Sequence, residues 1–269
     1  MRAAFERAAP DYDRVAALQR DVADRVLERL DLIRLDPRTV LDLGSGTGYG
    51  ARALRNRYRR AEVYGVDIAH GMLREASRLA PRFFARTHFA CGDALQLPLA
   101  SDTFDLVFSS LTLQWCEDLP AALAEIWRVC APGGLVLFST LGPDTLGQLR
   151  EAWSEADTLA HVNPFVDMHV VGDALVGTGF RDVVTDVDRI TRFHADVLDL
   201  MRSLKALGAH NVSRERPKHL VAPSRLARVR ERYETYRRAE GLPATYEVVF
   251  AHAWKPEPRV FVPFAGVGP

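Results

Sequence analysis

Apolar side chains recur with two different periods along this chain, and the periods separate predicted helices from predicted strands. Between residues 15 and 33 they fall three or four positions apart, at Val15, Leu18, Val22, Val26, Leu30 and Ile33. This spacing predicts an amphipathic helix with one buried face. The preceding residues 5–13 are interrupted by Pro10, so we expect a flexible lead-in there.

Short apolar runs alternate with helical patterns through the next hundred residues. Strands are predicted at 39–43, 62–66, 87–91, 104–109 and 135–140, and helices at 51–59, 71–79 and 119–129. Alternation of this kind predicts an α/β fold, in which a parallel sheet carries helices on both faces. Right-handed crossovers then decide how the sheet is wound.

The second half of the chain is less regular. We expect a helix at 144–158 and strands at 183–191 and 247–254, which bring the sheet to seven strands, mostly parallel. A largely helical stretch, about residues 192–245, is expected as a cap inserted before the last strand. Residues 1–254 then form a single domain, and the Pro- and Gly-rich residues 255–269 form a loosely packed tail.

The amino-acid composition limits the kinds of partner that we expect for this chain. The chain has 269 residues, 48% of them hydrophobic, and its 35 basic and 35 acidic residues give a net charge of +0. A neutral chain has no overall attraction for nucleic acid or membranes, so we expect neither as a partner. The three cysteines lack a C-x-x-C spacing, which argues against a disulfide framework and a structural metal site. Without an apolar leader or a membrane-length apolar run, a cytoplasmic protein is expected.

A glycine-rich turn directly follows the first predicted strand. Gly44, Gly46 and Gly48 form a G-x-G-x-G pattern before a predicted helix. Glycines let the backbone turn sharply and let a ligand approach the main chain, and the helix points N–H groups at that ligand. A nicotinamide-binding domain uses a similar pattern, normally G-x-G-x-x-G, so the turn alone leaves the ligand open.

Three carboxylates make the prediction of the ligand more specific. Asp67 ends the second strand, where a carboxylate can accept both hydroxyls of an adenosine ribose. Asp93 ends the third strand, where it can accept from the adenine amine while the Ala94 N–H donates to the ring. Asp42 precedes the glycines and places negative charge near a sulfonium. An acidic lining suits S-adenosyl-L-methionine better than it suits a pyrophosphate.

These motifs together resemble the class I S-adenosyl-L-methionine-dependent methyltransferases. The matching residues are 40–48, 65–67, 92–94, 104–108 and 128–134. The resemblance implies a Rossmann-like fold, S-adenosyl-L-methionine as cofactor and S-adenosyl-L-homocysteine as product. It also implies an N-terminal lid over the cofactor, about residues 1–35. We assign Gln19 and Ser110, which follows the fourth strand, to the cofactor site as well.

A closer resemblance runs from about residue 4 to residue 254. Residues 5–9, 113–116, 138–143, 161–163, 201–211 and 242–247 are similar to the malonyl-[acyl-carrier protein] O-methyltransferase family of biotin synthesis. The resemblance implies methyl transfer to the free carboxylate of a malonyl thioester on acyl-carrier protein, which starts pimeloyl assembly. The alternatives are another small-molecule methyltransferase, of quinone or trans-aconitate type, or a non-catalytic methyltransferase-like assembly factor. Intact glycines and Asp67 favour an active enzyme.

A malonyl carboxylate is already ionised at neutral pH, so its methylation needs positioning and a nearby cation, not a general base. Arg202 and Lys205 lie three apart on one predicted helix and share a face. Pairing of Arg202 with Asp199 on a solvated edge is the alternative. With the family resemblance, we predict that Arg202 holds the malonyl carboxylate and that Lys205 lies at the pocket mouth.

Further positions are predicted around the substrate. Tyr12 is the second catalytic candidate, because its hydroxyl can reach the carboxylate or the carboxyl group of the cofactor; the alternative is a surface aromatic. Gln114, Trp115 and Thr140 follow strands four and five, at the edge of the sheet where ligands bind. Trp115 is either a pocket wall or part of the core.

The segment 214–238 is locally basic, with nine basic and three acidic side chains. The carrier protein is acidic, so this face of the cap is predicted to steer it to the active site. Malonyl-coenzyme A remains an alternative thioester substrate, and an ordinary solvated helix is the alternative interpretation of the charge. Nucleic acid is disfavoured, because few aromatic side chains accompany the basic ones.

Overall fold

A seven-stranded sheet of order β3-β2-β1-β4-β5-β7-β6 organises the chain. The computed structural model describes residues 1–269 except 81–85, 158, 160, 208–221 and 259–269. The strands are β1 Thr39–Leu43, β2 Glu62–Asp67, β3 Thr87–Cys91, β4 Phe104–Ser110, β5 Cys130–Leu141, β6 Arg181–His194 and β7 Leu242–Trp254. The first five pair in parallel, and β7 runs antiparallel to both of its neighbours. The predicted fold class is confirmed.

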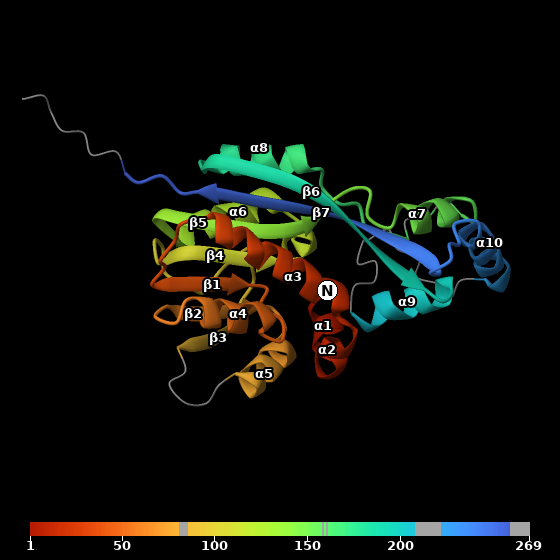
Figure 1. Ribbon diagram of the computed structural model, residues 1–269, viewed down its shortest axis with the longest axis horizontal. Coiled ribbons are helices and arrows are strands. Elements are labelled where there is room, and N and C mark those ends of the chain that lie inside the picture. The colour runs from red at the N-terminus through yellow and green to blue at the C-terminus, as the bar shows by residue number, and fades with distance from the viewer. Residues whose placement is uncertain (81–85, 158, 160, 208–221, 259–269) are drawn as a thin grey trace, which may run out of the picture.

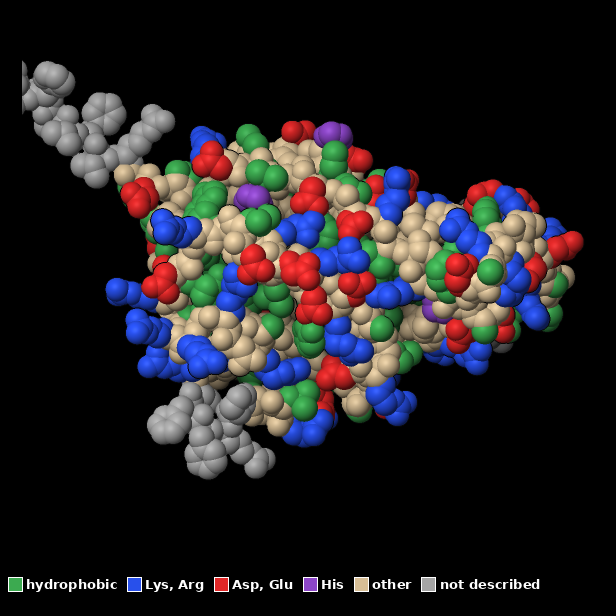
Figure 2. Space-filling model, in the orientation of Figure 1, with side chains coloured by type: hydrophobic (Ala, Val, Ile, Leu, Met, Phe, Trp, Pro, Cys, Tyr) green, Lys and Arg blue, Asp and Glu red, His purple; other side chains and the backbone are tan. Residues whose placement is uncertain are grey.

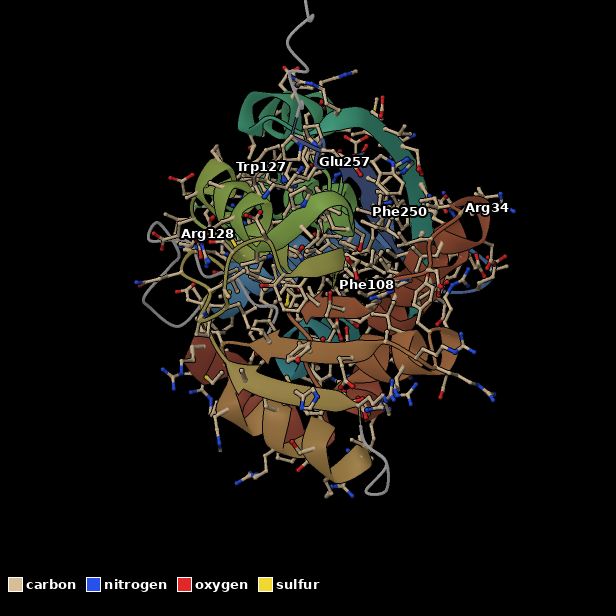
Figure 3. All side chains as sticks on the ribbon, turned by 90° about the vertical axis from the view of Figure 1, so that its left-hand side faces the viewer. Arg34, Phe108, Trp127, Arg128, Phe250 and Glu257 are labelled. Atoms are coloured by element: carbon tan, nitrogen blue, oxygen red, sulfur yellow. The ribbon has the colours of Figure 1, made fainter. Side chains whose placement is uncertain are left out.

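Helices cover both faces because successive strand residues point to opposite sides of the sheet. On β4, Leu106 and Phe108 pack with α3 Ala17–Arg29 and α4 Tyr49–Arg57, whereas Val107 packs with α6 Leu119–Val129 and α8 Met168–Thr178. Helix α5 His70–Leu79 packs against β2 and β3. Phe108 and Phe250 lie inside the molecule, whereas Arg34 projects from its surface (Figure 3). The central strands β1, β4 and β5 are therefore buried on both sides, as the predicted helices on both faces require, whereas the edge strands β3 and β6 are more exposed.

The N-terminal segment is helical, so the prediction of a flexible lead-in at residues 5–13 is wrong. Helix α1 Arg2–Ala8, the 3₁₀ turn η1 Ala9–Asp11 and helix α2 Tyr12–Val15 lead directly into α3. Pro10 stands at the start of η1, where its missing N–H has no partner to lose. Phe5 and Tyr12 pack against Met72 of α5, and this apolar contact holds the segment on the domain (Figure 1).

Strands β6 and β7 extend beyond the rest of the sheet. Strand β5 pairs with β7 only over residues 248–254, whereas β6 pairs with β7 down to residue 242. The two-stranded ribbon left over carries α9 Val197–Ala206 and α10 Pro223–Glu234 at its far end (Figure 1). The cap predicted at 192–245 is therefore shorter at both ends, because residues 192–194 and 242–245 pair as strands. Helix α7 Gly147–Ser154 packs on α10.

Other boundaries also differ from the predictions. Helix α7 is shorter than the predicted 144–158, because Leu146 adopts a left-handed backbone conformation with φ 55 immediately before it. Helix α8 was not predicted. Lys255 belongs to the core and not to a loose tail, since its Nζ donates to Asp102 and to the carbonyls of Trp127 and Cys130. Residues 259–269 of the predicted tail lie outside the described residues.

Candidate functional site

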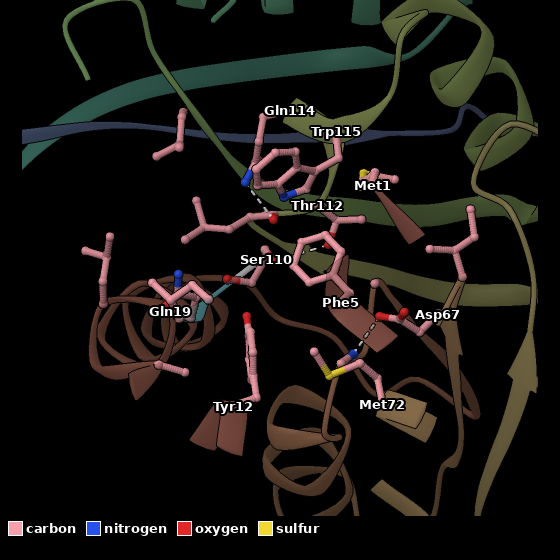
Figure 4. Close-up of a pocket in the computed structure, with 18 of the residues that line it drawn as sticks. Met1, Phe5, Tyr12, Gln19, Asp67, Met72, Ser110, Thr112, Gln114 and Trp115 are labelled. Atoms are coloured by element: carbon pink, nitrogen blue, oxygen red, sulfur yellow. Dashed lines mark hydrogen bonds between the residues drawn. The ribbon is translucent and has the colours of Figure 1, made fainter. Parts of the chain in front are cut away.

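A cavity of about 740 Å³ lies at the carboxyl ends of β1, β2 and β4, beneath the N-terminal helices and α9. This edge of a parallel sheet is where α/β proteins bind ligands. The cavity is lined by twelve of the predicted site residues, namely Tyr12, Gln19, Asp42, Gly44, Gly46, Asp67, Asp93, Ala94, Ser110, Gln114, Trp115 and Lys205. Figure 4 shows several of them facing the same space.

Three predicted residues do not line the cavity, each for a geometric reason. Gly48 is the N-cap of α4, and a Cβ there would lie 3.0 Å from the Ala76 Cβ, so this glycine shapes the helix start. Thr140 is buried behind Gln114, with its hydroxyl 3.5 Å from the Gln114 side-chain oxygen. It supports the wall and does not touch the cavity.

Arg202 is the third, and the structure does not support its predicted role. Met201, Leu204 and Lys205 of α9 face the cavity. A helix turns about 100° per residue, so Arg202 projects away from Met201 and into solvent. Its side chain is 73% exposed and lies 3.9 Å from Asp199. This is the solvated-edge alternative, and it leaves the role predicted for Arg202 to another group.

Two glycines open the turn after β1 to a ligand. Gly44 has φ 75, and a Cβ there would lie 1.9 Å from the Thr112 hydroxyl, so only glycine fits. Gly46 has φ 54, and a Cβ there would meet no atom of the described residues within 4 Å. Because Gly46 also lines the cavity, that open space is the place where a ligand approaches the main chain.

Asp67 ends β2 and points into the cavity (Figure 4). Its Oδ2 accepts the Gly46 N–H at 2.9 Å, and its Oδ1 accepts the Ala69 N–H at 2.8 Å. Burial raises the pKa of this carboxyl, while those two N–H groups lower it. Each oxygen of a carboxylate has a further lone pair, so Asp67 can still accept two hydroxyls of a ribose.

Asp42 is more deeply buried, with 3% of its surface exposed. Burial raises the pKa of its carboxyl to about 7. A hydrogen bond from the Ala51 N–H lowers this pKa and opposes part of the rise, whereas the Asp67 carboxylate adds to it. Its Oδ2 has no hydrogen-bond partner among the described residues. A buried carboxylate oxygen left unpaired is costly, and a cationic ligand in the cavity would compensate that cost.

Asp93 follows β3 at the outer end of the cavity, and its Oδ1 accepts the Leu95 N–H at 2.9 Å. Ala94 lines the same region beside Ile68, Leu95 and Cys116. These apolar side chains with one carboxylate at the edge match the shape and polarity of an adenine ring.

The N-terminal helices cover the cavity and are fastened to the glycine turn. The Thr47 hydroxyl donates to Asp13 Oδ1 at 2.6 Å. Phe5 of α1 meets Trp115 edge to face, with ring centroids 5.5 Å apart. Burial and the nearby Asp67 charge raise the pKa of Tyr12, so its hydroxyl stays neutral and is a donor. In Figure 4 that hydroxyl points toward Ser110 across the cavity.

This half of the cavity fits S-adenosyl-L-methionine on the properties of its own residues. Gln19 Oε1 is buried there and, like Asp42 Oδ2, lacks a partner in the described part of the chain. Acceptors without donors suit the ammonium, hydroxyl and sulfonium groups of this cofactor. Arg20 also lines the cavity, where it can meet the carboxylate of the cofactor.

The cavity continues under the cap into a second space, which we name the cap-side chamber. It is lined by α7, residues 161–165, α9, Tyr246 of β7 and the loop after β5. Leu146, Leu149, Trp153 and Phe165 make much of this lining apolar. Lys205 is exposed and lines the chamber, so it marks the mouth.

The basic face predicted at 214–238 is partly neutralised. Residues 214–221 lie outside the described residues. In the remainder, Arg232 pairs with Glu151 and Glu155 of the α7 region, Arg225 with Asp157, and Arg237 with Glu234. Figure 2 accordingly shows red and blue side chains intermingled over the cap. Arg228, Arg230 and Arg238 make no ion pair with any other described residue and carry what remains of the positive charge.

Within the described ranges, no three histidine, cysteine or carboxylate side chains are grouped so that they could hold a metal ion. None of the described helices is long and apolar enough to cross a membrane.

Several lining residues were missed by the sequence analysis. Arg20 and Asp13 belong to the predicted lid but carried no motif of their own. His161 and Tyr246 lie in segments noted only as family matches, at 161–163 and 242–247, and Trp153 was interpreted as part of an ordinary helix. These two segments and the predicted Lys205 were the signals available for the cap-side chamber.

Comparison with known proteins agrees with this geometry. Residues 41–138 match the family model described as a methyltransferase domain. The chain is 49% identical over 268 residues to a malonyl-[acyl-carrier protein] O-methyltransferase of Methylovorus sp., covering 98% of this chain and 90% of that protein. It is 51% identical over 256 residues to the protein of the same name from Halorhodospira halophila, covering 94% and 86%.

Solved structures share the fold at lower identity. The YcgJ protein from Bacillus subtilis superposes with a TM-score of 0.62 at 16% identity, covering 87% of this chain and 99% of that one. Phosphoethanolamine N-methyltransferase 2 of Haemonchus contortus, solved with S-adenosyl-L-methionine, gives a TM-score of 0.57 at 19% identity, covering 91% and 56%. Both place the sheet in the class I methyltransferase fold.

Proposed function

The chain belongs to the malonyl-[acyl-carrier protein] O-methyltransferase family, and from this we propose that it methylates the free carboxylate of a malonyl thioester on acyl-carrier protein. The cofactor is S-adenosyl-L-methionine, and the methyl ester formed starts pimeloyl assembly in biotin biosynthesis, in the cytoplasm. The observation that carries the proposal is the identity to relatives of this name over nearly the whole chain, cap included. The quinone, trans-aconitate and assembly-factor alternatives are not favoured.

The cavity supports an acyl substrate beside the cofactor. Its cofactor half holds the acidic groups that suit a sulfonium, whereas the cap-side chamber is largely apolar and opens beside Lys205. A thioester arm entering at Lys205 places a short acyl group between the chamber and the cofactor half. Lys205 and Gln114 then act as substrate-binding residues, as the sequence predicted.

When bound, the cofactor supplies a methyl group on a positively charged sulfur, and its transfer leaves S-adenosyl-L-homocysteine and a methyl ester. The carboxylate needs no general base because it is already ionised at neutral pH. What the protein must do is align the two reactants within about 3 Å and exclude water. The N-terminal helices exclude water, since Asp13 fastens them to Thr47 and Phe5 to Trp115.

Tyr12 is the catalytic residue of this scheme. Its neutral hydroxyl projects into the cavity near Ser110 and can donate to one carboxylate oxygen, which leaves the other oxygen to attack (Figure 4). A neutral donor orients the anion without removing as much of its nucleophilicity as a full positive charge at the same place would. The matched variant Tyr12→Phe keeps the ring and tests the hydroxyl alone.

The carrier protein is proposed to dock on the cap around the mouth of the chamber. Arg228 and Arg230 on α10 are free of ion pairs within the described residues, and Arg202 on α9 is exposed beside the mouth. We therefore propose that Arg202 belongs to this docking surface and does not bind the reacting carboxylate. Its charge raises the encounter rate with an acidic carrier, an effect that weakens as salt is added.

The activity is tested by incubating the protein with methyl-labelled S-adenosyl-L-methionine and three acceptors: malonyl-acyl-carrier protein, malonyl-coenzyme A and free malonate. We expect base-labile methyl ester on the carrier thioester, formed faster than on malonate. Label on none of the three acceptors would refute the proposal. Equal rates on the carrier and coenzyme A thioesters would show that the enzyme does not recognise the carrier protein.

The docking surface is tested by charge reversal. Arg228→Glu with Arg230→Glu is expected to raise KM for malonyl-acyl-carrier protein several-fold and to leave KM for malonyl-pantetheine unchanged, because pantetheine lacks the acidic protein that would contact α10. Arg59→Glu, an exposed arginine after α4 at the opposite edge of the sheet, is the matched control. If the control raises KM as much as the pair, the carrier does not dock at the cap.

A further inference from the structure

His161 is held in the wall of the cap-side chamber by two contacts. Its ring stacks on Trp153 of α7, with centroids 3.6 Å apart and planes within 8°. Its Nε2 lies 2.8 Å from Asp157 Oδ1, and the His161 side chain is only 9% exposed. His161 and Trp153 line the cavity, whereas Asp157 does not. The ring is therefore fixed from behind and from one face, with a cavity in front of it.

Asp157 decides which nitrogen of the ring remains for a ligand. Burial alone would raise the pKa of Asp157, but the Leu159 N–H, His161 and Arg225 lower it below its usual range. An ionised carboxylate can only accept a hydrogen bond, so Nε2 of His161 carries the proton that it donates. The ring nitrogen left for a ligand is Nδ1, which is a donor in the form of the ring that carries a proton on both nitrogens.

The chamber offers an anion few other partners. Among the described residues that line it on α7, at 161–165, on α9 and at Tyr246, none is an aspartate or a glutamate. Its basic groups are His161 and Lys205. Lys205 is exposed at the mouth, where water screens its charge, whereas His161 is buried and interacts in a less polar surrounding. Arg202, the predicted partner, points to solvent.

We infer that His161 is the substrate-binding residue that recognises the malonyl carboxylate, with Asp157 and Trp153 as its positioning residues. This inference rests on the proposed function and names the group in the site that selects an acyl chain ending in a carboxylate. The carboxylate accepts a hydrogen bond from Nδ1 through one oxygen while the other faces the cofactor half. A neutral acyl group of the same size finds no such partner and binds more weakly.

Binding to two probes, without turnover, tests the assignment. Malonyl-pantetheine and its terminal amide, which has nearly the same shape but no charge, are titrated calorimetrically into the protein saturated with S-adenosyl-L-homocysteine. We expect the unchanged protein to prefer the carboxylate by about tenfold or more, since hydrogen bonds to charged groups are the stronger ones. In His161→Gln the preference should fall to about threefold or less, with S-adenosyl-L-homocysteine affinity unchanged.

Two further variants separate this role from a structural one. His169→Gln, on the exposed start of α8 and outside the cavity, is the matched control and should keep the full preference. Asp157→Asn keeps the ring in place and should lower the preference by an intermediate factor, even if His161→Gln fails to fold. A preference unchanged in either His161→Gln or Asp157→Asn overturns the assignment.

Failure of the proposed function gives a different result. If the unchanged protein neither binds malonyl-pantetheine nor forms its methyl ester, the substrate is wrong and the role of His161 falls with it. If the unchanged protein does both and the His161→Gln variant still prefers the carboxylate, the substrate stands and only His161 is excluded.

Discussion

The Asp67→Asn variant separates cofactor binding from folding, because Asp67 accepts two backbone hydrogen bonds and is also the proposed acceptor of the cofactor ribose. The change keeps the volume of the side chain but removes the charge and one of the two acceptor oxygens. Those oxygens accept the Gly46 N–H at 2.9 Å and the Ala69 N–H at 2.8 Å. Asparagine can satisfy only one of these donors, and an unpaired N–H at a buried site costs about 1–3 kcal/mol.

A second effect opposes this loss, so the ligand-free Asp67→Asn variant should be nearly as stable as the unchanged protein. Burial is the largest influence on the Asp67 carboxyl and raises its pKa, so folding already disfavours the charge at this position. Asparagine removes that charge and offsets part of the lost hydrogen bond. We expect the melting temperature without ligand to change by no more than about 4 °C, at roughly 2–4 °C per kcal/mol for a domain of this size.

Cofactor affinity has no such compensation. Losing the charged acceptor of the ribose hydroxyls removes about 1.5–3 kcal/mol, which weakens S-adenosyl-L-homocysteine binding about 10- to 150-fold. Ligand at about 100 times the wild-type Kd stabilises the unchanged protein by about 2.7 kcal/mol, or roughly 5–11 °C. With a Kd raised about 100-fold the same concentration gives about 0.4 kcal/mol, or roughly 1–2 °C.

Calorimetric titration and thermal unfolding with and without ligand measure both quantities. Asp105→Asn is the control at the opposite end of the sheet, where Oδ2 of Asp105 alone accepts the N–H groups of Arg38 and Thr39. Because asparagine keeps one such oxygen, the control should change stability little and leave the Kd of S-adenosyl-L-homocysteine unchanged. A Kd for Asp67→Asn within about threefold of wild type would refute the place of the ribose at the end of β2.

Three other changes probe the same half of the cavity. Because burial raises the pKa of Asp42 to about 7, the folded protein keeps a proton that the unfolded chain releases, so ligand-free stability should fall as pH rises from about 4 to 7. Asp42→Asn should flatten that pH profile of stability in denaturant titrations. Above pH 7 the ionised Asp42 should also raise the affinity for S-adenosyl-L-methionine but not for the product, whose sulfur is neutral, and Asp42→Asn should remove this gain. Gly46→Ala should cost about 1–2 kcal/mol of stability through its positive φ. It should also weaken S-adenosyl-L-homocysteine binding by more than tenfold, because the new methyl group enters the cavity. Equal Kd values for the variant and the unchanged protein would contradict this. Thr47→Val removes the donor to Asp13 and should speed product dissociation several-fold in stopped-flow experiments while leaving the chemical step in single-turnover assays unchanged.

The cofactor half of the site was predictable because its geometry is local. A carboxylate or glycine in the last residues of a strand or just after it lies at the carboxyl edge of the sheet whatever the rest of the chain does. Asp42, Asp67 and Gly46 follow this rule, and all three line the cavity. Sequence also identified the alternation of strands and helices, since the apolar period is a property of each segment.

The cap side was not predictable in the same way. Whether Arg202 or Lys205 faces a cavity depends on the rotation of α9 about its axis, which is decided by the packing of Met201 and Leu204. The stacking of His161 on Trp153 joins residues from a helix and an irregular segment, and no periodic pattern connects them. The length of β6 and β7 likewise depends on their pairing with each other beyond the end of β5.

Sequence by itself therefore determined the fold class and the family, and it predicted the cofactor turn, because these follow from short-range patterns and short matching segments along the chain. Tertiary structure alone decided which cap residues line the cavity and which basic side chains make no ion pair among the described residues. The physical reason is that a side chain's partners across a cavity depend on helix rotation and chain closure. These are set by the packing of segments far apart in the sequence.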